Sequence, residues 1–212
     1  MNIIVFGATG KTGRDIVAGA LKNGHQVTAF VRNPSKLNMT HPNLHVHTGE
    51  ITNMEDVDRV TKAQHYDVVY SAIGSKGMFK REPLLIQAMH HMVKASEQNG
   101  VGKFIHISFA VVRSDAGKLG LLYKLIVPNV MKNLLHDHRE KDALIKQSSL
   151  NWVLVQPPIL TVDPYSGKYV HEERIHPDKS RKLKMSRANL ADFMLKLAND
   201  STYDDKEVFV TE

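Results

Sequence analysis

The chain contains no cysteine, so disulfide bonds, thiolate catalysis and thiolate metal sites are all excluded. Aromatic residues are few, at 7%, and there is one tryptophan. Long apolar runs are also missing: the longest, 119–131, is broken by Lys124 and Pro128 and is too short to span a membrane. An apolar strand begins at Asn2, which leaves no room for a signal or transit peptide. We therefore expect a cytoplasmic protein with no membrane partner.

The length and the net charge limit the domain organisation and the kinds of ligand that we expect. The 212 residues suit one domain, 1–212, in which we expect residues 157–187 to form a flap on the substrate side. The net charge of +6 suits an anionic ligand or nucleic acid equally well, but no nucleic-acid-binding motif is present and no nucleic-acid partner is expected. The densest basic stretch is either a solvated surface or a flap that helps to hold an anionic substrate. It comprises Lys179, Arg181, Lys182, Lys184 and Arg187.

The most informative feature present is a glycine-spaced turn between an apolar strand, 2–6, and a helical run that starts near residue 11. Gly7 lets the chain turn off the strand, Gly10 lets backbone N–H groups approach a pyrophosphate, and Gly13 lets the helix pack closely on the sheet. The helix N-terminus directs free N–H groups and a positive dipole end toward the anion. The turn predicts a dinucleotide phosphate site, to which Thr9, Lys11 and Thr12 also belong.

Two other interpretations of this turn were weighed. Gly10-Lys11-Thr12 resembles the end of the phosphate loop of nucleotide hydrolases, but that motif needs a glycine five positions before Gly10, where Val5 stands inside the strand. The other interpretation is a tight strand-to-helix turn without a ligand. The strand before the turn and the helix after it are the context that a dinucleotide site requires, and they favour the phosphate site.

Strand-like and helical patterns alternate along most of the chain. Strands are expected at 2–6, 26–31, 44–48, 67–72, 103–108, 152–156 and 207–211. Helices are expected after the glycine turn, from a capping box at 52–55, over 83–98, over most of 112–149 with an interruption at Pro128, and over 186–198. This alternation predicts an α/β fold, a Rossmann-type doubly wound parallel sheet with a small C-terminal lobe on the substrate side.

Ligands of such a sheet bind beyond the carboxyl ends of its strands. We therefore expect the glycine turn, Ala72-Ile73-Gly74, Ser108 and Pro157-Pro158 to converge on one crevice. Ser108 is the expected catalytic hydroxyl, in contact with the nicotinamide or the substrate. The alternative is a serine that only satisfies backbone groups at the end of its strand.

The identity of the dinucleotide depends on the end of the second strand. NAD-specific sites usually place a carboxylate about 20 residues after the glycines, but here Arg32 stands 19 positions after Gly13. A guanidinium can bind a 2′-phosphate through two hydrogen bonds, so NADP(H) is the expected cofactor, with Lys36 or Ser35 as a second contact. The alternative is that Arg32 is a solvated loop residue.

Taken in order, the motifs resemble the atypical short-chain dehydrogenase/reductase group that contains biliverdin-IXβ reductase (flavin reductase) and the NmrA-like proteins. The resemblance spans nearly the whole chain and rests on residues 7–13, 31–33, 49–50, 71–74, 107–108, 140–144 and 149–158. It implies that Glu50 and Ile51 lie beside the adenine, although aspartate is more usual at position 50. It further implies that residues 72–74 line the nicotinamide ribose and that Pro157, Pro158 and Ile159 border the nicotinamide amide.

The chain departs from the wider superfamily where alcohol dehydrogenases carry their catalytic Tyr and Lys, four positions apart. Tyr123 is followed four positions later by Val127, and Tyr165 is followed by Lys168 at the wrong spacing. Without a tuned tyrosine to protonate an alkoxide, ordinary ketone reduction is not expected. Hydride transfer to a conjugated acceptor remains open, since its charge is delocalised and solvent can supply the proton.

Twelve histidines raise the question of a metal site. His136 and Glu140 share a helix face, and His45 and His47 share a strand face, but neither pair has a third ligand and no metal is expected. The run 136–138 either touches substrate or, as the favoured interpretation, lies on a solvated helix surface.

The sequence therefore predicts an NADPH-dependent oxidoreductase that transfers hydride to a small-molecule acceptor such as a flavin or a quinone. The alternative is a non-catalytic NADP(H)-sensing regulator of the NmrA-like type. A nucleotide-sugar epimerase is disfavoured, since such relatives usually keep the Tyr/Lys pair.

Overall fold

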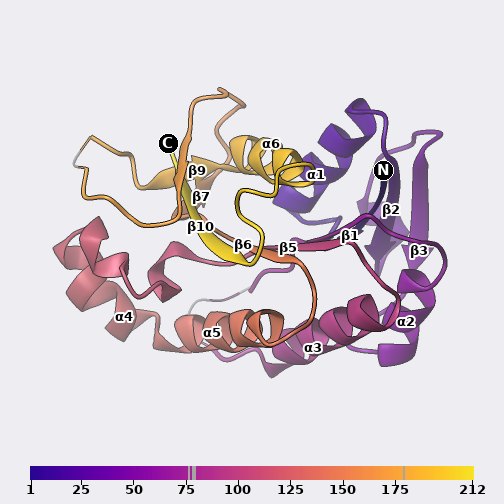
Figure 1. Cartoon of the computed structure of the whole chain (residues 1–212), viewed down its shortest axis with the longest axis horizontal. Coiled ribbons are helices and arrows are strands. Elements are labelled where there is room, and N and C mark those ends of the chain that lie inside the picture. Colours follow the sequence, from indigo (N-terminus) through magenta and orange to yellow (C-terminus); the bar gives the residue numbers. More distant parts are fainter. Residues whose placement is uncertain (76, 78–79, 179) are drawn as a thin grey trace.

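The computed structural model describes residues 1–75, 77, 80–178 and 180–212, and within them an eight-stranded sheet lies between two layers of helices (Figure 1). The strand order is β3-β2-β1-β4-β5-β6-β10-β8, and all neighbours are parallel except β8 and β10. On one side of β1 the sheet continues through β2 to β3, and on the other side it continues from β4 through β5 to β6. The switch point between β1 and β4 is where sheets of this kind bind ligands. The expected Rossmann-type fold is confirmed.

The central strands are buried and mostly apolar, because helices cover both faces of the sheet. In order, the strands of the sheet are β1 (Asn2–Phe6), β2 (Gln26–Val31), β3 (Leu44–Thr48), β4 (Val68–Ser71), β5 (Lys103–Ile107), β6 (Trp152–Gln156), β8 (Val170–Glu172) and β10 (Lys206–Thr211). Two further strands, β7 (Ile159–Thr161) and β9 (Lys184–Ser186), pair in parallel outside this sheet. The short strands β7, β8 and β9 lack a clear period-two pattern, and the sequence did not predict them.

The helices divide between the two faces as a doubly wound fold requires (Figure 1). They are α1 (Lys11–Lys22), α2 (Met54–Thr61), α3 (Pro83–Gln98), α4 (Val127–Val130), α5 (Lys132–Lys146) and α6 (Arg187–Leu197). One face is covered by α1 and α6, and the other by α2, α3 and α5. The apolar stripe Ile16, Val17, Ala20 and Leu21 explains why α1 packs down on the sheet.

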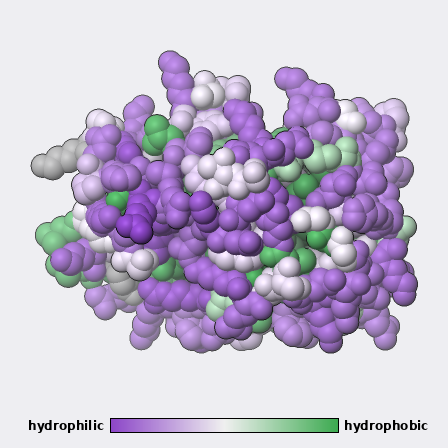
Figure 2. Space-filling model, viewed as in Figure 1, coloured by the Kyte–Doolittle hydropathy of each residue, from purple (hydrophilic) through white to green (hydrophobic). Residues whose placement is uncertain are grey.

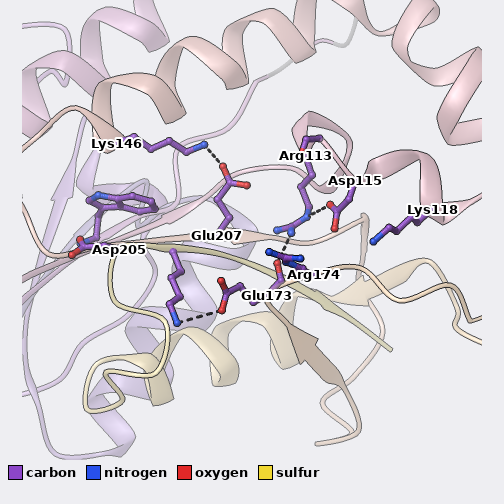
Figure 3. A pocket seen from close by; sticks show the side chains of 11 residues that line it. Arg113, Asp115, Lys118, Lys146, Glu173, Arg174, Asp205 and Glu207 are labelled. Atoms are coloured by element: carbon purple, nitrogen blue, oxygen red, sulfur yellow. Dashed lines mark hydrogen bonds and ion pairs between the residues drawn. The ribbon is translucent and has the colours of Figure 1, made fainter.

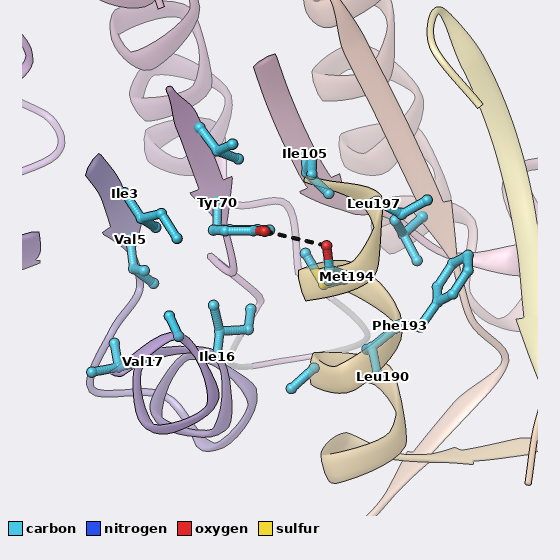
Figure 4. Packing of buried hydrophobic residues seen from close by; sticks show 14 of the residues in the cluster. Ile3, Val5, Ile16, Val17, Tyr70, Ile105, Leu190, Phe193, Met194 and Leu197 are labelled. Atoms are coloured by element: carbon cyan, nitrogen blue, oxygen red, sulfur yellow. Dashed lines mark hydrogen bonds between the residues drawn. The ribbon is translucent and has the colours of Figure 1, made fainter. Parts of the chain in front are cut away.

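The core on the α1 and α6 side also contains the buried hydroxyl of Tyr70, on β4 (Figure 4). This O–H donates a hydrogen bond to the carbonyl oxygen of Met194 in α6, at 3.3 Å. Burial raises the pKa of Tyr70, so the side chain stays neutral and acts as a donor. The bond ties the centre of the sheet to the last helix.

Two expectations about helix boundaries are wrong. Asn53, and not Thr52, caps α2, because its side chain accepts hydrogen bonds from the backbone N–H groups of Glu55 and Asp56. The helical region after β5 is interrupted at Met131 (φ −104°, ψ 22°), whereas Pro128 lies in the first turn of α4, where the missing N–H costs nothing.

Candidate active site

The glycine turn places the N-terminus of α1 directly on the end of β1. Gly7 has φ +83°, and the Gly10 N–H donates to its carbonyl oxygen at 2.9 Å. A Cβ on Gly13 would lie 2.1 Å from that same oxygen, and a Cβ on Gly7 would lie 2.6 Å from the carbonyl oxygen of Ala72. The turn therefore requires glycine at both positions. Gly7 is needed for its positive φ and for the close approach of Ala72, and Gly13 is needed for the close approach of Gly7.

The first turn of α1 is suited to an anion. Gly10 provides no side chain to cap the helix, and the first turn carries no acidic residue. The N–H groups of this turn have no carbonyl partners within the helix, and the positive end of the dipole lies beside the cleft. The donor set fits the pyrophosphate of a dinucleotide, with Lys11 adding a positive charge and Thr12 a hydroxyl at the cleft wall.

A cleft of about 750 Å³ opens at the carboxyl ends of the strands. Several of the residues that the sequence assigned to the cofactor line it together: Gly10, Lys11, Thr12, Ala72, Ile73, Gly74, Ser108, Pro157, Pro158 and Ile159. Its other walls are largely apolar and come from Ile107, Phe109, Met131, Leu134 and Leu160. No tyrosine is among the described residues that line this cleft. The structure thus brings together four strand ends that are far apart in sequence.

The residues assigned to the adenosine end lie outside the wall of this cleft. Arg32 and Glu50 form an exposed ion pair, with Nε 3.5 Å from Oε1. The carbonyl oxygen of Lys36 accepts a hydrogen bond from Nη2 of Arg14 at 2.5 Å, which brings a second guanidinium to this end. Ile51 lies in the loop between β3 and α2, where its carbonyl oxygen is 3.3 Å from Nδ1 of His91. Thr9 lies half-buried within the glycine turn.

The helix α5 brings the buried carboxyl group of Asp142 against Ser108, one of the residues that line the cleft. Ser108 donates a hydrogen bond from Oγ to Oδ2 of Asp142, at 2.6 Å. Burial raises the pKa of Asp142 to about 6, against the opposing effects of the Ser108 hydrogen bond and the charges of Lys141 and Lys146. Lys141 is itself only 1% exposed, and burial lowers its pKa. The hydroxyl of Ser108 is therefore oriented by a buried carboxylate and not by strand-end backbone.

His138, one turn earlier on α5, lines the same cleft. Burial, reinforced by the charge of Lys141, lowers the pKa of His138 to about 3, so the imidazole is neutral at physiological pH. Among the described residues its Nδ1 has no hydrogen-bond partner, and its ring lies 5.9 Å from that of Phe109. His138 therefore presents a neutral, largely buried ring at the wall of the cleft.

The residues of the run 136–138 differ in their exposure and in their partners. His136 is solvated and pairs with Glu140 at 2.9 Å, as expected of a helix surface. That expectation is wrong for Asp137 and His138, which are buried. Asp137 accepts a hydrogen bond from the backbone N–H of Glu82 at 2.7 Å and pairs with Arg81, and so anchors the start of α3.

The sequence reasoning missed the part that α5 plays in the site. His138, Lys141 and Asp142 are spaced by three and four positions and therefore share one face. A polar stripe that continues the buried face of an amphipathic helix is the signal that could have identified them. For the run 136–138 the general preference of histidine and charged residues for the protein surface favours the solvated interpretation instead.

The basic stretch is divided between surface pairs and the cleft. Lys184 pairs with Asp163 at 2.6 Å, and Arg181 pairs with Glu172. Arg187 donates from Nη1 to the carbonyl oxygen of Thr161 at 2.8 Å and lines the cleft. Lys179 lies outside the described residues, and Lys182 is exposed.

A second hollow, of about 550 Å³, lies near the amino ends of β6 and β10 (Figure 3). Its charged side chains largely neutralise one another: Arg113 pairs with Asp115 at 2.8 Å, and Lys146 pairs with Glu207. It contains none of the residues predicted for the cofactor. Among the described residues there is no group of three or more potential metal ligands, and no helix is long and apolar enough to cross a bilayer.

Comparisons with known proteins agree with this geometry. Residues 7–201 match the family model described as NAD(P)H-binding. A chloroplastic protein of Arabidopsis thaliana is 28% identical over 176 residues, which cover 80% of this chain and 63% of that protein. A UPF0659 protein of Saccharomyces cerevisiae is 25% identical over 92% of this chain and 86% of its own length. The chain thus spans less than two thirds of the Arabidopsis relative.

Solved structures share the fold at low sequence identity. An anaerobilin reductase from Escherichia coli O157:H7 is 18% identical, with a TM-score of 0.80 over 100% of this chain and 97% of its own. A short-chain dehydrogenase/reductase from Veillonella parvula, solved in complex with NADP, is 19% identical, with a TM-score of 0.78 over 100% and 94%. Together with the family match over most of the chain, these similarities show that the protein belongs to the NAD(P)H-binding family of Rossmann-fold proteins.

Proposed function

We propose that this protein is an NADPH-dependent reductase that transfers hydride to a flat, conjugated acceptor such as a flavin or a quinone. The observation that carries the proposal is the set of residues that line the cleft. Apolar side chains form most of its walls beyond the glycine turn, and the oriented hydroxyl of Ser108 and the neutral ring of His138 provide polar contacts. Such a surface suits a planar ring system with a few hydrogen-bonding atoms.

In this proposal the chain holds the cofactor along the strand ends. The backbone of the glycine turn binds the pyrophosphate, Arg32 and Lys36 bind the 2′-phosphate, and Glu50 and Ile51 border the adenine. Residues 72–74 contact the nicotinamide ribose, and residues 157–159 contact the amide. When bound, NADPH supplies the hydride, so that NADPH, acceptor and one proton give NADP⁺ and the two-electron-reduced acceptor.

The roles left to the side chains are orientation and hydrogen bonding. Asp142 fixes the rotamer of Ser108, whose oxygen faces the bound molecules with its lone pairs. His138 is neutral and offers a ring nitrogen to a carbonyl or ring nitrogen of the acceptor, in the tautomer that the acceptor selects. Solvent supplies the proton, because the charge of the reduced acceptor is delocalised.

The test is NADPH oxidation followed spectrophotometrically with riboflavin phosphate or menadione as acceptor. We expect acceptor-dependent turnover by the native protein. We expect His138→Ala to lower kcat/KM for the acceptor about tenfold, the size of one hydrogen bond in a desolvated site, with an unchanged Kd for NADPH. His136→Ala, on the solvated face of the same helix, is the matched control and leaves both constants unchanged. Absence of turnover with either acceptor refutes the enzymatic proposal.

One observation favours a second candidate, a non-catalytic sensor of the NADP(H) redox state. None of the described residues that line the cleft is a tyrosine, so no Tyr/Lys pair is present among them to donate a proton. His138, which lines the cleft, is neutral at physiological pH and is not a proton donor of that kind. A sensor predicts a large difference between the Kd values for NADP⁺ and NADPH, measured by calorimetry, without turnover of any acceptor.

A further inference from the structure

The segment between β5 and α5 leaves a set of large apolar side chains in contact with water. Five of them, here called the α4 face, are between 53% and 71% exposed: Leu121, Leu122, Leu125, Ile126 and Val130. Figure 2 shows hydrophobic residues gathered at the end of the molecule where α4 lies. Single exposed apolar residues are ordinary, but a contiguous group of five marks an interaction surface.

The α4 face does not have a role in packing this chain, because the opposite side of the same segment already does that. Tyr123 and Val127 point inward and pack with Val111 and Leu135 in a small separate core. The spacing 121, 122, 125, 126 and 130 keeps the exposed residues on one side of the π-helical turn, Leu122–Ile126, and of the α4 helix that follows it. The segment is therefore apolar on two sides, and only one is covered.

The charges that the segment itself carries are of one sign. Lys118, Lys124 and Lys132 flank it, and no acidic residue occurs between Asp115 and Asp137. All three lysines are exposed, and none forms an ion pair within the part of the chain that the structure describes. Apolar side chains surrounded by lysines are the pattern of a helix that lies in the interface of a bilayer containing anionic lipids.

We propose that the α4 face docks on the surface of a membrane that contains anionic lipids. A second copy of the chain fits this surface less well, because a symmetric dimer would bring six of these lysines together with no carboxylate from the segment to pair with them. Docking is peripheral, through side chains that enter the headgroup region. Met131 and Leu134, which follow the α4 face directly, line the cleft, so docking places the mouth of the cleft beside the bilayer.

The experiment is co-sedimentation of the full chain with vesicles of phosphatidylcholine alone and of phosphatidylcholine mixed with phosphatidylglycerol. We expect binding to the mixed vesicles only, and weaker binding at high salt. The triple variant Leu122→Ser, Leu125→Ser, Ile126→Ser lowers the partition coefficient at least about tenfold, because each side chain loses a favourable transfer into the interface. Lys124→Gln and Lys132→Gln each lower it about fivefold.

Val46→Ser is the matched control, since Val46 is an exposed apolar residue on β3, at the other end of the molecule (Figure 1). It leaves vesicle binding unchanged. NADPH binding by every variant shows that the fold is retained. The proposal is overturned if the native chain does not bind the mixed vesicles, or if the triple variant binds them equally well. It is also overturned if the chain forms a dimer that the triple variant dissociates and shows no affinity for vesicles.

Discussion

The contact between Gly13 and Gly7 makes Gly13→Ala the most sharply defined perturbation of this molecule. The added Cβ would lie 2.1 Å from the carbonyl oxygen and 2.8 Å from the carbonyl carbon of Gly7, where ordinary contacts fall at 3.4–4 Å. Both atoms belong to the backbone of a turn that Ala72 supports from the other side. Relief of the overlap therefore requires α1 to move away from the turn by about 1 Å.

Two effects of opposite sign determine the stability of this variant. Alanine is favoured over glycine within a helix by roughly 0.5–1 kcal/mol. Forcing a methyl group into a closely packed backbone contact costs about 1–3 kcal/mol or more. The second effect is larger, so the free energy of unfolding in urea should fall by about 1–2 kcal/mol. Displacement of the N–H groups of α1 should also raise the Kd for NADPH at least about tenfold, as expected for the loss of one charge-assisted hydrogen bond.

Gly19→Ala, in the same helix, is the matched control. Its Cβ would lie 2.5 Å from Cδ1 of Leu195, which is the end of a flexible side chain and can rotate away. We expect unfolding free energy within about 0.5 kcal/mol of the native value and an unchanged Kd for NADPH. The reasoning is refuted if Gly13→Ala unfolds and binds NADPH like the native protein, or if both variants lose the same stability.

Three further predictions concern single side chains. Arg32→Ala should raise the Kd for NADPH at least about tenfold and leave the Kd for NADH unchanged, whereas equal effects on both would show that the guanidinium does not bind the 2′-phosphate. The pKa of Asp142 is raised on folding from its ordinary 3.8 to about 6, so protonated Asp142 stabilises the fold below about pH 4 and this contribution is lost as the pH rises through 6. The unfolding free energy of the native chain relative to Asp142→Asn should therefore fall by about 2 kcal/mol between pH 4 and pH 7, and parallel pH profiles would contradict the buried carboxylate. Tyr70→Phe removes the hydrogen bond to the Met194 carbonyl and should lower the unfolding free energy by about 1 kcal/mol, measured by urea denaturation.

The fold could be predicted because the local sequence patterns indicate the same main strands and helices that the structure contains. The parallel strands are apolar runs, and the helices α1 and α3 end at the stop signals Asn23-Gly24 and Asn99-Gly100. Boundaries that depend on competing caps were less certain: Thr52 has the spacing of a capping box, yet Asn53 provides the cap. The strands β7, β8 and β9 depend on long-range pairing, which no local pattern reveals.

The site was only partly predictable for the same reason. The conformation of the glycine turn depends on residues that are close together in sequence, so Gly7, Gly10 and Gly13 could be assigned from their spacing. The importance of α5 depends on its tertiary position, because burial is the largest cause of the altered pKa values of Asp142 and His138. The ion pair between Arg32 and Glu50 also joins residues from two strand ends, and position in the sequence does not indicate their contact.

The uncapped first turn of α1 also links the abundance of this protein to its ligand. Helices generally satisfy their first N–H groups with a side chain, and here Gly10 provides none. A dinucleotide that binds only the folded chain therefore contributes to folding by mass action, by about 2.7 kcal/mol at a hundredfold excess over its Kd. Because cells degrade unfolded chains, the steady-state level of this protein would rise and fall with the supply of reduced nicotinamide dinucleotide.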